Sequence, residues 1–282
     1  MYLDTITVDN ANIDIWGEYE PSFAPVVKAF VTNFTDFGEL GAAIAIYYRG
    51  RKVLDMWGGH VDQARSLAWE KDTLVSTASV FKGMMSFLVH MLVYRGQLSY
   101  DSPVADYWPE FAKNGKSDIS IRQAVSHHAA LPYCDESEPG DILRWDKWVE
   151  AVTKQAPEWQ PGSKGVYHTL TIAPIIGGLV EAVTGKRVWQ LFREEITEAL
   201  DVDYHLSLND DEYLRLAPDF ETSGFFEDIS LDSEIMTRFF RPVGDLSTVL
   251  GKEEKIVESP NLRISDPPAV HEALQGCSLL LR

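Results

Sequence analysis

The chain has very little cysteine and no long apolar segment. Only Cys134 and Cys277 occur among 282 residues, too few for a disulfide framework and not spaced as metal ligands. No stretch approaches the roughly 18 apolar residues that a membrane-spanning helix needs. The N-terminus has no basic region followed by an apolar run, so we expect no signal peptide and a cytoplasmic protein.

Basic residues are also scarce. The chain has 25 lysines and arginines against 43 aspartates and glutamates, a formal net charge of −18. A strongly negative surface repels phosphate backbones and anionic headgroups, so we expect no nucleic-acid and no membrane partner. Residues 201–240 hold eleven acids and two bases, a net charge of −9, and we favour a solvated face over an acidic binding patch there.

Common cofactor and catalytic motifs are missing as well. The sequence has no H-E-x-x-H, no G-x-S-x-G, no Walker loop and no G-x-G-x-x-G fingerprint. Its seven histidines form no cluster with metal-ligand spacing, and the neighbours His127 and His128 would point apart on a helix. We therefore expect no metal site and no cofactor.

What the chain does contain is a series of helix and strand patterns. Apolar residues recur at helical spacing over 21–37, and residues 41–59 predict two strands joined at Gly50. Further helices are predicted over residues 79–95, 120–131, 145–156, 170–184 and 187–200. The apolar arc of the first of these is so wide that we expect it to be buried on most sides.

These patterns indicate a mixed α/β (α+β) protein, and the length fits one large domain or two lobes. We assign residues 1–77 to the N-terminal part of an α/β lobe, made of a helix and a β-hairpin. Residues 78–258 form a mostly helical lobe and residues 259–282 an irregular tail in this assignment, because periodicity fades after about residue 240.

A serine and a lysine stand one turn apart at the start of the apolar helix. Helical positions i and i+3 share a face, so Lys82 can reach the hydroxyl of Ser79. An apolar surrounding lowers the pKa of an amine, which would let Lys82 accept the serine proton. The alternative is that Ser79 only caps the helix and Lys82 is solvated, since S-x-x-K occurs often by chance. Gly83 adds to the catalytic interpretation, because we expect close packing there.

Tyr167 is a further candidate. It lies in the polar, glycine-bearing loop "PGSKGVYHTL", directly before a buried helix, where a tyrosine can exchange a proton with a leaving group. The alternative is an aromatic side chain that only fills space.

The order of these features resembles a known family. The hairpin "GAAIAIYYRGRKVLDMWGG" is followed by the S-x-x-K motif, "DSPVADYWPEF", "SHHAALP" and "PGSKGVYH". In this order the motifs are similar to those of the β-lactamase-related serine hydrolases, and most of all to class C-like, family VIII-type esterases. The similarity runs from about residue 19 to about residue 208, and more weakly to residue 268.

The resemblance implies a β-lactamase/transpeptidase-like fold, with one α/β lobe and one mostly helical lobe. It implies that Ser79 is the acylated nucleophile, Lys82 its general base and Tyr167 the residue that helps protonate the leaving group. It also implies that the backbone amide of Ser79 donates to the oxyanion. The substrate would be a small ester or amide, and no cofactor would take part.

The chain departs from the family pattern at three places. Thr169 stands where asparagine is common, which disfavours β-lactams as substrates. Ala130 stands where glycine is common, and an alanine would be strained there if the backbone needs a positive φ. The later K-T-G or H-x-G motif is absent, and the chain ends before the family's last strands, as in a truncated member.

The missing strands would have two consequences. The hairpin of residues 41–58 would lack sheet partners, and an isolated hairpin is marginally stable in water. One oxyanion donor would also be lost. We therefore expect an esterase that acts through an acyl-enzyme on Ser79. The alternatives left open are a catalytically impaired remnant and a β-lactamase or D-amino-acid peptidase.

Overall fold

The structure, a computed structural model, describes residues 2–8, 11–218, 238, 241–242 and 280–281, which group into two compact units. Of the described residues, 2–8, 11–75 and 214–218 belong to the first unit, and 76–213, 238, 241–242 and 280–281 belong to the second. Residues 214–218 belong to the first unit because Leu74 exchanges backbone hydrogen bonds with Arg215 and Ala217. The predicted domain assignment stays a prediction, since its second boundary and most of its tail lie outside the described residues.

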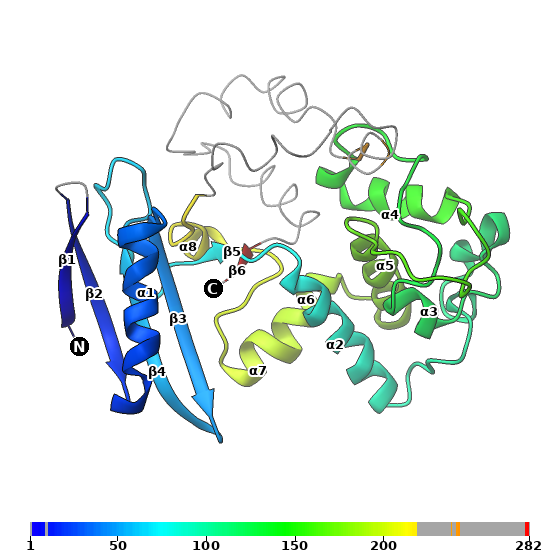
Figure 1. Ribbon diagram of the computed structural model, residues 1–282. Helices are drawn as coiled ribbons and strands as arrows, with labels where there is room; N and C mark the ends of the chain where they lie inside the picture. The colour runs from blue at the N-terminus through cyan, green and yellow to red at the C-terminus, as the bar shows by residue number, and fades with distance from the viewer. Residues whose placement is uncertain (1, 9–10, 219–237, 239–240, 243–279, 282) are drawn as a thin grey trace. The chain divides into compact units, whose positions relative to one another are not determined.

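An antiparallel sheet with strand order β1-β2-β4-β3 forms the first unit, together with helix α1 (Figure 1). Its strands are β1 (Tyr2–Val8), β2 (Ala11–Tyr19), β3 (Gly41–Tyr48) and β4 (Arg51–Gly59). The 3₁₀ turn Pro21–Phe23 leads into α1 (Ala24–Asp36), whose Phe30 and Phe34 are buried. Their rings pack against inward side chains of the sheet, namely Ile13, Ile15, Leu54 and Met56.

Strands β1 and β2 were not predicted, and they change the account of the hairpin. β4 pairs with β2 as well as with β3, so the hairpin of residues 41–58 does not lack sheet partners. The expectation of an isolated, marginal hairpin is therefore wrong. Strands β2 and β4 approach closely where Gly17, with a φ of 135°, lies opposite Met56. A Cβ at Gly17 would lie 2.0 Å from the backbone oxygen of Asp55.

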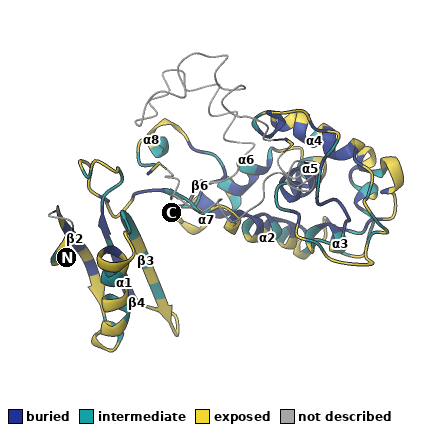
Figure 2. Ribbon diagram, turned by 45° about the horizontal axis from the view of Figure 1, so that its top comes forward, coloured by how far each residue is buried: buried dark blue, intermediate teal, exposed yellow. Residues whose placement is uncertain are grey.

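The second unit is mostly helical and is centred on α5 (Ile172–Thr184). Residues Ile172–Val180 of this helix are all buried, as the dark blue ribbon in Figure 2 shows. Around it lie α2 (Val80–Tyr94), α3 (Ile121–Val125), α4 (Trp145–Lys154) and α6 (Val188–Phe192). The described part of this unit also contains the π-turn Arg193–Thr197, α7 (Glu198–Leu200), α8 (Asp210–Tyr213) and the 3₁₀ turns Val104–Asp106, Pro109–Gly115 and Asp141–Leu143. The two-residue strands β5 (Val75–Ser76) and β6 (Leu280–Leu281) form a separate small sheet.

Helix α2 begins and ends where the sequence predicts, but its burial is one-sided. One stripe is buried in the core of the second unit, namely Phe81, Met85, Leu88 and Leu92. The neighbouring stripe is not, because Val80 is 53% and Phe87 47% exposed. The expectation of burial on most sides is wrong. So is the expected close packing at Gly83, since no atom lies within 4 Å of the position a Cβ would take there.

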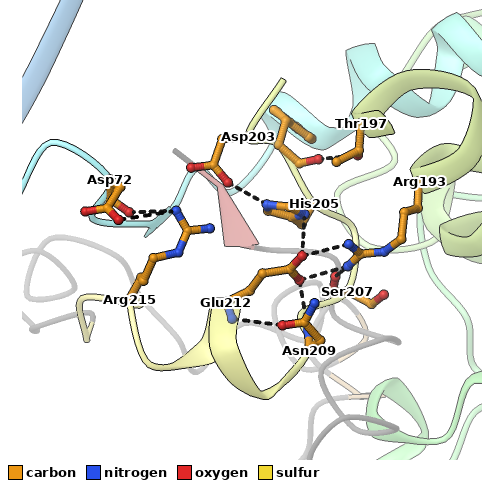
Figure 3. A network of polar contacts seen from close by, with 10 residues as sticks. Asp72, Arg193, Thr197, Asp203, His205, Ser207, Asn209, Glu212 and Arg215 are labelled. Atoms are coloured by element: carbon orange, nitrogen blue, oxygen red, sulfur yellow. Dashed lines mark hydrogen bonds and ion pairs between the residues drawn. The ribbon is translucent and has the colours of Figure 1, made fainter. Parts of the chain in front are cut away.

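A polar network holds helix α8 of the second unit (Figure 3). Arg193 of the π-turn makes two hydrogen bonds of 2.7 and 2.8 Å to the carboxylate of Glu212 in α8. Glu212 also accepts the backbone N–H of Asn209, and buried His205 lies between Glu212 and Asp203. A carboxylate held by a two-pronged arginine pair has a defined orientation, so α8 is anchored to the π-turn.

Two properties of the described residues bear on partners. None of their helices is both long enough and apolar enough to cross a membrane. In the same part of the chain, no group of three or more histidine, cysteine, aspartate or glutamate side chains is placed to hold a metal ion. Cys134 is a buried free thiol, and burial raises its pKa to about 12, so it is not a reactive thiolate.

Candidate active site

A strained turn presents Ser79 at the start of α2. Ala78 has a φ of 45°, a left-handed conformation that costs a non-glycine residue about 1–2 kcal/mol. Beyond it, Ser79 takes the N-cap position of α2 and is exposed. Its hydroxyl makes no capping hydrogen bond to the helix backbone. The serine therefore does not serve as an ordinary cap, and its oxygen is available for other contacts.

The predicted contact between the serine and the lysine is present. The Lys82 amine donates to the Ser79 hydroxyl over 2.9 Å, although Lys82 itself is only 8% exposed. Its Nζ lies 4.5 Å from the ring centroid of Phe81 and 4.9 Å from that of Tyr167. Ser79 is therefore exposed, whereas the amine that it contacts is buried beside two aromatic rings.

The surroundings of Lys82 weaken its proton affinity. Burial lowers the pKa of the amine below its ordinary value, and hydrogen bonding and charge interaction with Tyr167 only partly offset this. Among the described residues, no aspartate or glutamate acts on this pKa. A buried amine without a carboxylate partner loses the usual stabilisation of its charged form, which favours the neutral amine that a general base requires.

Tyr167 lies over the same amine and is 47% exposed. Burial raises the pKa of its phenol, but hydrogen bonds with Ser79 and Lys82 and the positive charge of Lys82 outweigh that effect. The pKa of Tyr167 therefore lies below its ordinary value. The three side chains predicted from the sequence meet within one unit of the structure, through the Lys82–Ser79 hydrogen bond and the contact between Lys82 Nζ and the Tyr167 ring.

The loop that carries Tyr167 is fastened to the segment after α3. Helix α3 ends at Val125, so the predicted helix over 120–131 is six residues too long, and His127 and His128 lie in a loop. Backbone N–H groups of Val166 and Gly162 donate to the carbonyls of His127 and His128. The His128 ring also packs against Gly165, where a Cβ would lie 3.0 Å from ring atoms.

His168 completes this fastening and was not singled out from the sequence. Its side chain is fully buried, and its Nε2 accepts the backbone N–H of Leu131 over 3.1 Å. Since Nε2 accepts, the ring proton is on Nδ1, which donates to the carbonyl of Val166 over 2.6 Å. Burial lowers the pKa of His168 to about 4, so the ring is neutral. Thr171 adds a third bond by donating to the Leu131 carbonyl.

Ala130 confirms the strain expected in this segment. Its φ is 60° and its side chain is fully buried, so an alanine occupies a left-handed position that glycine would adopt without cost. Thr169, the other departure from the family pattern, follows His168 and is partly exposed.

A serine at a helix start, a buried lysine one turn later and a loop tyrosine over the amine define the serine hydrolases that use an S-x-x-K motif. The chain belongs to the Beta-lactamase family, whose sequence profile matches residues 27–218.

Relatives and solved structures agree with this assignment. The esterase/β-lactamase LipL of Mycobacterium tuberculosis is 38% identical over 189 residues, which are 67% of this chain and 44% of LipL. The structure of a family VIII carboxylesterase matches with a TM-score of 0.70 and 37% identity, over 73% of this chain and 57% of that one. A penicillin-binding protein homologue from Caulobacter crescentus matches with a TM-score of 0.71 and 36% identity, over 74% and 57%. The chain thus spans about half the length of the proteins it matches.

Proposed function

We propose that the chain is a serine hydrolase that cleaves small carboxylic esters through an acyl-enzyme on Ser79. The observation that carries the proposal is the 2.9 Å contact between an exposed serine hydroxyl and a buried amine whose pKa is lowered. A purely structural lysine gains little from this position, because burial penalises its charge and no carboxylate of the described residues offsets the cost.

Acylation begins with the neutral amine of Lys82. The Ser79 proton moves to Nζ as Oγ attacks the ester carbonyl carbon, and the carbonyl electrons move to its oxygen. The oxyanion lies near the start of α2, where the dipole of the helix places partial positive charge. When the carbonyl re-forms, the bond to the alcohol oxygen breaks. The proton from Lys82 passes to that oxygen through the phenol of Tyr167, whose ring lies beside the Lys82 amine.

Deacylation reverses these roles with water. Lys82 and Tyr167 are then again able to take a proton, so a water molecule that attacks the acyl carbon delivers its proton to them. The bond between Ser79 Oγ and the acyl carbon breaks, the serine regains its proton, and a carboxylic acid leaves. All steps use groups of the chain itself, and none needs an oxidant or a reductant.

Esters are preferred to lactams as the substrate class for two reasons. Two of the matched proteins are named as esterases, one of them also as a β-lactamase. In addition, Thr169 stands where an asparagine would hold the side-chain amide of a lactam. A threonine hydroxyl has fewer hydrogen-bonding atoms than the carboxamide of asparagine, so it would hold that amide less well. Ester turnover should therefore exceed lactam turnover.

The test is covalent labelling of the folded chain with a fluorophosphonate, located by mass spectrometry. Ser86 offers a matched control, because it lies on the same helix and is not part of the site. We expect an adduct on Ser79 in the wild type and in Ser86→Ala, and none in Ser79→Ala. Lys82→Met should slow labelling by about 10²–10⁴-fold, the range for loss of a general base.

Two results would count against the proposal. The first is a sample with native helix content that carries no adduct on Ser79. The second is labelling that is as fast in Lys82→Met as in the wild type. Hydrolysis of p-nitrophenyl acetate compared with that of a chromogenic cephalosporin then decides between ester and lactam.

A further inference from the structure

His127 occupies an unusual backbone position between α3 and the Tyr167 loop. Its φ is 64°, in the left-handed region that few side chains adopt without cost. Strained residues of this kind persist where the surrounding structure holds them, and they gather at functional sites. His127 is held on both sides, because its carbonyl accepts the N–H of Val166 and its ring faces the next two residues of that loop.

The ring of His127 contacts the segment that carries the phenol. Its Nδ1 accepts the backbone N–H of His168 over 3.1 Å, so Nδ1 is unprotonated and the ring proton of neutral His127 is on Nε2. The ring centroid lies 4.8 Å from that of Tyr167, with an angle of 48° between the planes. The bond and the ring contact act on adjacent residues, and together they fix both the backbone and the side chain of Tyr167.

The charged and titratable groups around His127 keep it neutral. Burial lowers its pKa, and the positive charge of Lys82 and the neighbouring His128 lower it further. Among the described residues, Tyr167 and His168 also contact the ring. A protonated ring would lose its acceptor at Nδ1 and would place a positive charge beside the Lys82 amine, so the positioning contact requires the neutral form.

We propose that His127 is a positioning residue that holds the phenol of Tyr167 over the amine of Lys82 by accepting the N–H of His168. This role rests on the proposed function, because it concerns the tyrosine that passes the proton to the leaving group. His127 itself touches neither the nucleophile nor the substrate in this account. It acts through the loop.

Two substitutions separate the acceptor from the rest of the ring. Asparagine tolerates a positive φ and places an oxygen where Nδ1 accepts, so His127→Asn keeps the hydrogen bond and loses the ring. Glycine adopts the same backbone without strain and offers no acceptor, so His127→Gly loses both. His90→Asn is the control, because exposed His90 on α2 has, among the described residues, one hydrogen-bond partner, the Tyr100 hydroxyl.

Three properties of these variants are measured: kcat and KM for p-nitrophenyl acetate, the rate of fluorophosphonate labelling at Ser79, and the titration of Tyr167. The titration is followed by NMR of the protein labelled with ¹³Cζ-tyrosine, with the Tyr167 signal assigned from Tyr167→Phe. For His127→Gly we expect kcat to fall by about 10²-fold, the effect of misplacing a reacting group by about 1 Å, with KM little changed. His127→Asn should recover most of this loss. The phenol pKa should rise towards its ordinary value in His127→Gly, because contact with Lys82 is loosened.

Contrary results are equally specific. The proposal is overturned if His127→Gly keeps the wild-type kcat, if the asparagine and glycine variants are equally impaired, or if the Tyr167 titration is the same in all variants. If the wild type is not labelled at Ser79, the proposed function fails. The NMR titration still decides whether His127 positions Tyr167, so the two failures are distinguishable.

Discussion

Replacing His168 by leucine should destabilise the second unit in a way that depends on pH. The side chain is fully buried and joins two loops through Leu131 N–H and the Val166 carbonyl. Leucine fills much of the ring's volume but satisfies neither backbone group. Each buried unsatisfied polar group costs about 1–3 kcal/mol, so the variant should lose about 2–6 kcal/mol at pH 7.

The loss should shrink as the pH falls. In the folded chain the pKa of His168 is lowered to about 4, against an ordinary value of 6.5. Between these values the unfolded chain binds a proton that the folded chain does not, so the wild type loses stability as pH falls from about 6.5 to about 4. One pKa unit corresponds to about 1.4 kcal/mol, which gives roughly 3 kcal/mol over this window. His168→Leu lacks this proton uptake.

The assay is urea unfolding of both proteins between pH 4 and pH 7.5, followed by circular dichroism. The free-energy difference between wild type and His168→Leu should narrow by roughly 3 kcal/mol towards pH 4. His90→Leu, on the exposed side of α2, should show a small and nearly pH-independent difference. A constant gap between wild type and His168→Leu across the range would refute the neutral, buried histidine.

Two further changes test backbone strain in the two units. Ala78→Gly should stabilise the second unit by about 0.5–1 kcal/mol in urea unfolding, because glycine relieves the left-handed strain before Ser79. Ala182→Gly, at an exposed position inside α5, should instead cost about 1 kcal/mol, and equal signs for the two would contradict the assigned strain. Gly17→Ala should cost more than about 3 kcal/mol and remove strand signal from the circular dichroism spectrum, because its Cβ would overlap the β4 backbone. Gly38→Ala, which has a similar need for positive φ but open space around it, should cost only about 1–2 kcal/mol, and a mild effect at both glycines would argue against the β2–β4 pairing.

The sequence predicts the elements whose side chains repeat regularly. Helix α1, the β3–β4 hairpin, α4 and α5 were all predicted. Each of them buries one face or its whole length, so its apolar residues recur in the sequence at a regular spacing. The β1–β2 pair was missed although Ile13 and Ile15 alternate with polar residues, which is a strand pattern. The alternation in residues 11–19 therefore indicates a strand as strongly as the same pattern in the middle of a chain.

Some residues of the candidate site were likewise predicted from the sequence, and others were not. The contact between Ser79 and Lys82 was predicted because a spacing of three positions on a helix brings two side chains together, whatever the rest of the fold. His127 and His168 were missed because their hydrogen bonds join loops about 40 residues apart in the sequence, as the bond from His168 N–H to His127 Nδ1 does. No local pattern encodes such a contact. The available signal was only the repeated histidines inside two short motifs.

The proton affinity of Lys82 carries the whole account of the site. The most direct test is NMR titration of the protein labelled with ¹³Cε-lysine, with the Lys82 signal assigned from Lys82→Met. We expect the Lys82 amine to titrate below its ordinary pKa of 10.5, because burial outweighs its contact with Tyr167. A Lys82 amine that keeps its proton to 10.5 or above would contradict the account, since it could not take the proton of Ser79.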